Sequence, residues 1–212
     1  VYNGPDRHMN GIRLKERGEQ ILEKQMERER NLNKIRGCLL GGAAGDALGY
    51  PVEFLSDREI RSRYGEEGIR DYETDWETGL ALISDDTQMT LFTANGLLWG
   101  ETQACTGGVS RDPVSCIGLA YQDWYFTQTG KMLRKKSISW LLDVPELHRR
   151  RAPGTTCLSA LRSGKMGSVE EPLNHSKGCG GIMRVAPLGL GGWLSDRKQI
   201  DLAAAEAAAL TH

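Results

Sequence analysis

Glycine recurs every four residues within one largely apolar segment of the chain, at Gly37, Gly41, Gly45 and Gly49. This spacing places all four glycines on one face of a helix. Each interior glycine costs about 1 kcal/mol relative to alanine, so four on one face indicate close approach by another helix or by a ligand. The segment 35–49 suits a buried helix, and Pro51 is expected to end it. The sequence therefore predicts closely packed helices.

Further helical patterns follow along the chain. Ser84 has the character of a helix N-cap, with two acids in the first turn behind it and an amphipathic pattern beyond. Other helices are expected over residues 58–64, 113–128, 137–142, 155–162 and 201–210. No segment shows sustained alternation of polar and apolar residues, so strands are few at best. The predicted fold class is all-α.

The chain divides by composition into two parts. Residues 1–33 form a charged arm, in which Lys, Arg, Glu and Gln dominate and only a thin apolar stripe runs through. We expect this arm to be a solvated helix or disordered, and its mixed charges favour neither nucleic acid nor a partner coil. Residues 34–212 form the predicted domain proper.

Composition excludes several classes of function. The net charge is −1, from 27 basic and 28 acidic residues, which gives no electrostatic basis for binding nucleic acid or an anionic membrane. No stretch reaches the roughly 18 apolar residues that span a bilayer. The five cysteines are scattered, without metal-binding spacing, and indicate reduced thiols and a cytoplasmic protein.

Four oxygen-bearing side chains stand in a row at Ser84-Asp85-Asp86-Thr87, and two more acids, Asp46 and Glu53, lie upstream. Adjacent carboxylates repel each other, and a hard cation such as Mg²⁺ or Ca²⁺ would reconcile them. The alternative is a plain helix start, since Ser followed by acids is a common stabilising pattern. From these residues alone both interpretations stay open.

A second constellation is the loop 174–184, which contains Gly178-Cys179-Gly180-Gly181 after Lys177. Backbone N–H groups freed by the glycines could face an anion, so the loop is a candidate phosphate cradle. Its spacing matches neither a P-loop nor a dinucleotide fingerprint, and a plain loop is the alternative. Cys179 as a nucleophile is disfavoured, because no His–carboxylate partner is evident.

Taken together, these segments resemble the ADP-ribosylglycohydrolase family, which includes ADP-ribosylarginine hydrolase and the dinitrogenase reductase-activating glycohydrolase. The resemblance begins near residue 34, runs to the end of the chain, and is carried by four ordered blocks. They are residues 36–54, residues 84–89, residues 153–156 and residues 176–189.

The resemblance implies an orthogonal multi-helix domain that holds two metal ions, usually Mg²⁺, with Mn²⁺ as the other candidate. It implies that Ser84, Asp85 and Asp86 are metal ligands. It also implies that Glu53 is the acid near the reacting ribose. Substrate-binding residues carried over in the same way are Asp46, Ser176, Lys177, Gly178, Cys179, Gly180 and His212. Many relatives have Asn where this chain has Cys179, which would alter the contacts to ribose.

The implied reaction hydrolyses the bond between ADP-ribose and a modified protein side chain, with arginine expected. Two metals would orient the ribose hydroxyls and lower the pKa of a water, and a carboxylate would remove its proton. The catalytic candidates are Glu53, as base or substrate gate, then Asp85 and Asp86, and the transition state would have oxocarbenium character. The substrate would be an ADP-ribosylated protein or a small ADP-ribosyl compound.

Family members complete the metal site with an Asp-x-Asp-(Ser/Thr) cluster near the C-terminus, and no such cluster follows residue 184. We therefore expect a domain incomplete at its C-terminus, with half a metal site and weak or no activity in these 212 residues alone. The rival hypothesis is a non-catalytic member of the fold that binds ADP-ribose or has a structural role.

Overall fold

The computed structural model describes residues 6–108, 111–192, 194 and 196–212, with side chains from residue 20 onward. These residues form six α-helices and five short 3-10 helices, and no strand is assigned among them. An isolated bridge between Thr74 and Ala81 is the one extended pairing in that set. The predicted all-α class is confirmed.

The chain forms two compact units, residues 1–38 and residues 39–212. Helix α1 (Asp6–Gly49) supplies all of the described first unit and begins the second. Within the first unit, the apolar side chains Ile21, Leu22 and Met26 are exposed, as expected of a solvated helix. The boundary at residue 34 that composition indicates stays a prediction.

The second unit contains the helices that matter for the site. After α1 come α2 (Asp57–Tyr64), α3 (Asp85–Gly107), α4 (Pro113–Thr129), α5 (Thr155–Arg162) and α6 (Arg197–Ala209). The 3-10 helices are η1 (Tyr50–Val52), η2 (Trp140–Asp143), η3 (Pro145–His148), η4 (Cys179–Gly181) and η5 (Ala186–Gly189).

Local sequence signals account for most helix ends. Helix α3 begins after Ser84, whose side chain accepts from the Asp86 N–H, and it ends at Gly108 in the left-handed region (φ 65°). Asp112 caps α4, Pro113 occupies its first turn, and Gly130 ends it at φ 70°. The start of α3 after Ser84 and the extent of α4 agree with the sequence-based expectations.

The helix expected over residues 137–142 is wrong, because that stretch enters the 3-10 helix η2 instead. The buried Asp123 carboxylate accepts from the N–H groups of Ile138 and Ser139, at 2.9 and 3.0 Å. Ser139 is thereby held extended, with φ −95° and ψ 116°. Arg134 neutralises the carboxylate at 2.6 Å, so Asp123 organises this connection from the core side.

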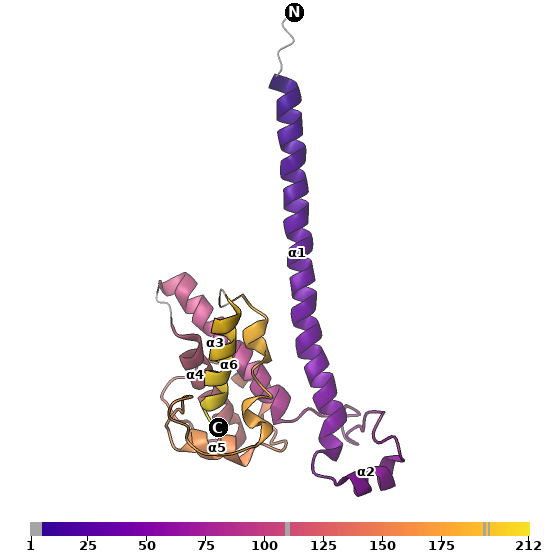
Figure 1. The fold of residues 1–212 in the computed structure, drawn as a ribbon. Helices are drawn as coiled ribbons and strands as arrows, with labels where there is room; N and C mark the ends of the chain where they lie inside the picture. The colour runs from indigo at the N-terminus through magenta and orange to yellow at the C-terminus, as the bar shows by residue number, and fades with distance from the viewer. Residues whose placement is uncertain (1–5, 109–110, 193, 195) are drawn as a thin grey trace, which may run out of the picture. The chain divides into compact units, whose positions relative to one another are not determined.

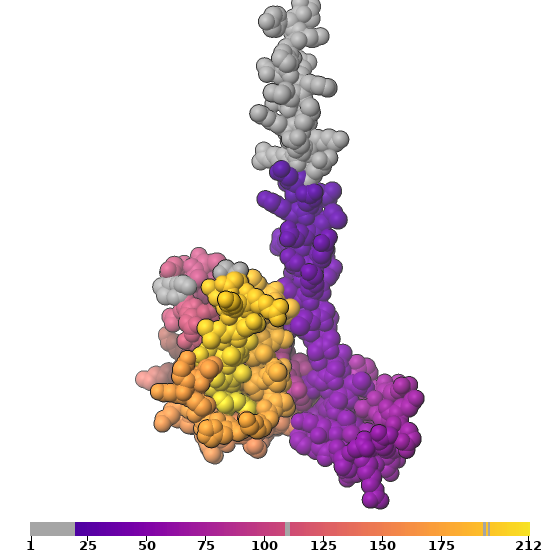
Figure 2. Space-filling view, in the orientation of Figure 1, coloured from indigo at the N-terminus to yellow at the C-terminus, as the bar shows by residue number. Residues whose placement is uncertain are grey.

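The core lies where α3 packs on α4, with α5, α6 and η5 around them, and Figure 1 shows α3, α4 and α6 gathered in one body. Met89 and Phe92 of α3 meet Tyr121 and Trp124 of α4 in a fully buried cluster. A Cβ at Gly96 would lie 2.8 Å from the Cys116 carbonyl oxygen, so the two backbones approach closely there. In Figure 2 the yellow surface of α6 lies against the gold surface of the segment that precedes it in the chain.

The face of α1 that carries Gly41, Gly45 and Gly49 has no such neighbour within the described residues. Apart from the adjacent residues and the backbone of α1 itself, no described atom lies within 4 Å of a Cβ built at any of the three. The close helix approach expected from their spacing is therefore not made within the described part of the chain. The expectation of a buried helix over residues 35–49 is wrong as well, because Ala47 alone of these residues is buried. Among the described residues, no helix is long and apolar enough to cross a membrane.

Candidate active site

Asp46, near the end of α1, is bonded to the start of α3. Its Oδ2 accepts from the backbone N–H groups of Ser84 and Thr87, at 2.9 and 3.2 Å, and from the Thr87 hydroxyl at 2.5 Å. A carboxylate at this position satisfies helix N–H groups that otherwise lack partners and complements the helix dipole. Asp46 thus holds the Ser84–Thr87 turn against α1, and a direct contact with substrate stays a prediction.

Asp85 is almost fully buried, with 3% of its surface exposed. The Gly154 N–H donates to its Oδ2 at 2.8 Å, and its own N–H donates to the Arg151 carbonyl oxygen at 3.1 Å. Burial, with Asp86 and Glu53 nearby, raises the pKa of the Asp85 carboxyl to about 7, although the Gly154 bond opposes the rise. The fold therefore holds Asp85 in place at a cost in stability once it ionises.

The variant Asp85→Asn is expected to stabilise the metal-free chain by about 2–4 kcal/mol at pH 8 and to change little at pH 4. Below pH 3.8 the wild-type carboxyl is protonated whether the chain is folded or unfolded. Between pH 3.8 and 7 it ionises only in the unfolded chain, so wild-type stability falls as the pH rises. The check is urea unfolding of both proteins at the two pH values in EDTA. Equal stability at pH 8 would contradict the buried, strained carboxylate.

Asp86 and Glu53 belong to the same acidic surface. Asp86 is half-buried, and desolvation followed by the charge of Asp46 raises its pKa. Glu53, just after η1, is exposed, and its pKa is raised by desolvation, Asp86 and Asp46 in that order. Desolvation raises the pKa of Tyr50, and the nearby charges of Glu53 and Asp85 raise it further. The fold thus brings the two separated acidic motifs together.

The loop 174–184 is held by its own side chains. Asn174 donates from Nδ2 to the Thr211 carbonyl oxygen at 2.8 Å and accepts from the Ser176 N–H at 2.9 Å. Ser176 Oγ lies 3.2 Å from the Thr156 hydroxyl and accepts from the Gly178 N–H at 3.2 Å. Ser176 and Gly178 are therefore placed by internal hydrogen bonds at the start of the loop, in a fixed relation to α5.

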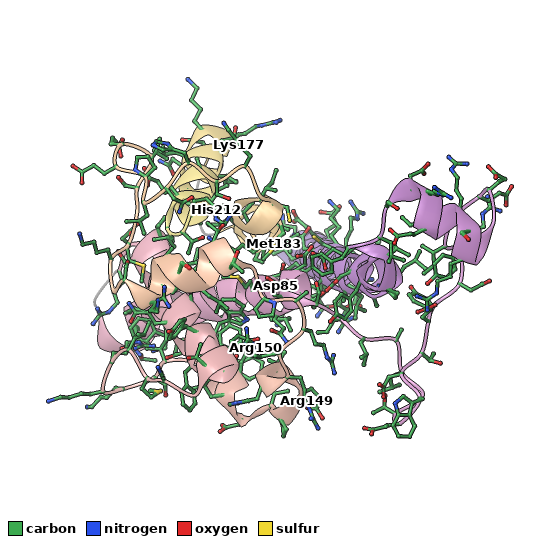
Figure 3. All side chains as sticks on the ribbon, turned by 90° about the horizontal axis from the view of Figure 1, so that it is seen from below. Asp85, Arg149, Arg150, Lys177, Met183 and His212 are labelled. Atoms are coloured by element: carbon green, nitrogen blue, oxygen red, sulfur yellow. The ribbon has the colours of Figure 1, made fainter. Side chains whose placement is uncertain are left out.

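The loop lies close to the acids. Burial raises the pKa of the Cys179 thiol, and the nearby charges of Asp86, Asp85 and Glu53 raise it further. Thr90 of α3 donates toward the Met183 carbonyl oxygen at 3.2 Å, a direct contact between the two segments. Lys177 is exposed, and in Figure 3 it lies beyond His212 from Asp85 and Met183.

Gly180 and His212 meet at close range. A Cβ at Gly180 would lie 2.7 Å from His212 Cε1 and 2.8 Å from Cys157 Sγ, closer than side-chain atoms pack. The missing side chain therefore leaves the space that the imidazole edge occupies. Beside Ser176, a pocket of about 550 Å³ opens between α5 and the residues before the loop. Hydroxyl groups line it, from Thr155, Thr156, Ser159, Ser163 and Ser176, together with Lys165 and Asn174.

The donor chemistry near Ser84 fits a hard cation in part. The Ser84 hydroxyl and the Asp85 and Asp86 carboxylates carry oxygen donors of the kind that hard cations prefer. Burial, followed by neighbouring carboxylates, raises the pKa of both carboxyls. Over the residues whose side chains are described, no group of three or more His, Cys, Asp or Glu is arranged to hold a metal ion. These residues therefore match one side of a cation site, and their role as ligands stays a prediction.

Several residues of the site carried no assigned role from sequence. Gly154 holds Asp85 by its N–H, and Tyr50 and Arg151 flank the acids. Thr211 Oγ1 lies 2.9 Å from His212 Nδ1, and Arg184 donates to the same oxygen at 2.7 Å. Tyr50, Gly154 and Arg184 lie within the blocks that carry the family resemblance, which was the available signal, whereas Arg151 and Thr211 lie outside them.

Comparison with known proteins gives one family and one relative. Residues 27–212 match the family model described as ADP-ribosylglycohydrolase. An uncharacterized protein of Archaeoglobus fulgidus is 31% identical over 160 residues, which are 74% of this chain and 42% of the archaeal protein. The chain thus spans less than half the length of that relative. No solved structure gave a significant match.

Proposed function

The chain belongs to the ADP-ribosylglycohydrolase family, and from this premise we propose that it hydrolyses the glycosidic bond between ADP-ribose and a modified protein side chain, with arginine as the expected residue. The family supports hydrolysis of an ADP-ribose linkage. The arginine linkage and the dependence on Mg²⁺ or Mn²⁺ are the finer parts of the proposal. The substrate would be an ADP-ribosylated protein or a small ADP-ribosyl compound.

One observation carries the proposal. The acids Glu53, Asp85 and Asp86 come from two segments, and the loop lies beside them: Thr90 of α3 donates to the Met183 carbonyl oxygen at 3.2 Å, and the three charges raise the pKa of Cys179. A cluster of carboxylates beside a glycine-rich loop suits a substrate with a reacting sugar at one end and a diphosphate beyond it. Neither half alone would favour this reaction over a helix cap or a plain loop.

The proposed roles of the residues come from the family resemblance, and their positions are compatible with them. We assign Ser84, Asp85 and Asp86 to holding a divalent cation, which when bound would orient the ribose hydroxyls and acidify a water. Glu53 is exposed, and its raised pKa makes its carboxylate a stronger base, which suits a group that takes a proton from water. The loop from Ser176 to Gly180 and the ring of His212 would bind the diphosphate and the distal ribose.

The pocket of about 550 Å³ next to Ser176 would accept the part of the substrate beyond the diphosphate. Its hydroxyl-rich lining can donate and accept hydrogen bonds with a sugar or a nucleobase. Lys165 adds positive charge at its edge. The substrate would then extend from the acids, along the loop, and toward α5.

A panel of substrates tests the linkage. ADP-ribose should be released by the protein that contains this chain from ADP-ribosylated arginine, in the presence of Mg²⁺, and not from ADP-ribosylated serine or from NAD⁺. Free ADP-ribose would be measured by chromatography. Release from serine alone would replace arginine while keeping the hydrolase, whereas release from no substrate would contradict the enzyme.

The second candidate is a non-catalytic ADP-ribose-binding or structural protein. It is favoured by the lack of a complete His, Cys, Asp or Glu cluster for a metal over the side chains described. Calorimetry separates the two candidates, because a binder would take up ADP-ribose equally with and without EDTA and would release none from any substrate.

A further inference from the structure

Arg184 is a buried cation with no acidic partner among the described side chains. It has no exposed surface, and none of the ion pairs among the described side chains includes it. Its guanidinium lies over the Tyr121 ring, 4.3 Å from the centroid. Its Nη2 lies 3.2 and 3.3 Å from the carbonyl oxygens of Ala207 and Ala208, at the C-terminal end of α6. The negative end of the helix dipole thus compensates its charge.

The same Nη2 donates to the Thr211 hydroxyl oxygen at 2.7 Å. A guanidinium can only donate, so Thr211 Oγ1 is the acceptor in this bond. The hydroxyl keeps one hydrogen of its own, and two atoms lie within reach of it. They are His212 Nδ1 at 2.9 Å and Cys157 Sγ at 3.9 Å.

The imidazole nitrogen is the better of these two acceptors. The Cys157 thiol is distant, its pKa is raised by burial, and a protonated sulfur is a weak acceptor. If Nδ1 carried the proton instead, both Arg184 Nη2 and His212 Nδ1 would donate to Thr211 Oγ1. The Thr211 hydroxyl hydrogen would then have only the Cys157 sulfur as its acceptor. The first arrangement satisfies each group at a normal distance, and in it Nδ1 accepts.

We propose that Arg184 and Thr211 are positioning residues that fix the tautomer of His212, so that Nδ1 accepts from Thr211 and Nε2 carries the proton. Nε2 is then an N–H donor on the side of the ring that faces the loop. A Cβ built at Gly180 would lie 3.0 Å from Nε2, and one at Gly178 would lie 3.9 Å away. Figure 3 shows His212 between Lys177 and Met183 in that view.

The charge state agrees with this arrangement. Burial, and then the positive charge of Arg184, lower the pKa of His212, so the ring is neutral at and above neutral pH. A neutral ring with Nδ1 occupied can offer a single donor, at Nε2. That donor would bond an oxygen of the diphosphate or the distal ribose. This contact with the substrate rests on the proposed function.

Nitrogen-15 NMR of the metal-free chain with labelled histidine tests the assignment without any substrate. The chain has four histidines, and the spectrum of His212→Gln identifies the signals of His212. At pH 8 we expect a protonated Nε2 and an unprotonated Nδ1. A proton on Nδ1 in the wild-type chain would overturn the proposal.

Two variants of Thr211 extend the test. Thr211→Val keeps the shape but removes the hydroxyl, and it should give a mixture of tautomers and weaken ADP-ribose binding about fivefold to tenfold. Thr211→Ser keeps the hydroxyl and should retain the wild-type tautomer, with binding within about twofold. An unchanged His212 tautomer in Thr211→Val would overturn the positioning role of Thr211. If the wild type binds no ADP-ribose, the proposed function fails, while the tautomer signals still test whether Thr211 fixes the His212 ring.

Discussion

Asp86→Asn is expected to lower the rate of ADP-ribose release about a thousandfold in the protein that contains this chain, while the fold is kept. Asp86 is half-buried and belongs to the first turn of α3, where its backbone N–H is already satisfied by Ser84 Oγ at 3.2 Å. Asparagine keeps that geometry and the shape of the side chain but removes one of the charges assigned to the cation. Initial rates on ADP-ribosylated arginine at saturating Mg²⁺ measure the effect.

The matched control is Asp57→Asn. Asp57 is also an acid in the first turn of a helix, α2, but it is exposed and pairs with Arg61 on the surface at 3.0 Å. A surface pair of this kind contributes about 0–1 kcal/mol, so both stability and rate should stay close to wild type. Equal rates for wild type, Asp57→Asn and Asp86→Asn would contradict the assignment of Asp86 to the reaction.

Gly180→Ala is expected to raise KM at least about tenfold and to lower the free energy of unfolding by about 1–3 kcal/mol. The added methyl group would lie 2.7 Å from His212 Cε1 and 2.8 Å from Cys157 Sγ. Cys157 is buried and cannot retreat, so the imidazole must turn away from the loop. Steady-state kinetics and urea unfolding of the same preparation give both numbers.

Gly189→Ala is the control for adding a methyl group in this region. Gly189 ends η5, and a Cβ there meets no atom within 4 Å. Its KM and stability should match those of the wild type. A Gly180→Ala protein with unchanged KM would show that the contact between the loop and His212 has no part in binding.

The elements that the sequence predicts well are those fixed by short-range interactions. Ser84 caps α3, α4 begins at the expected Pro113, and Pro51 follows the end of α1, as their chemistry requires. Helix α5 covers the expected residues 155–162. Each signal acts over a few residues, so the sequence beside it contains the whole cause.

The elements that the sequence does not predict depend on distant partners. The helix expected at 137–142 does not form: Ser139 is extended, and the N–H groups of Ile138 and Ser139 donate to Asp123 on α4, a partner distant in sequence. The grouping of Arg184 with Thr211 and His212 needs the end of α6 to pack against η4. The acids were recognised as a site only through their resemblance to a family, since a helix cap and a cation site use the same residue types.

We propose that Glu53 and the acids in the first turn of α3 serve a cation-dependent hydrolysis of an ADP-ribosyl bond. The most direct measurement follows ADP-ribose release from ADP-ribosylated arginine by one preparation of the protein that contains this chain, first with Mg²⁺, then with excess EDTA, then with Mg²⁺ restored. We predict release, loss of release and full recovery. Release that continues unchanged in EDTA would contradict the claim.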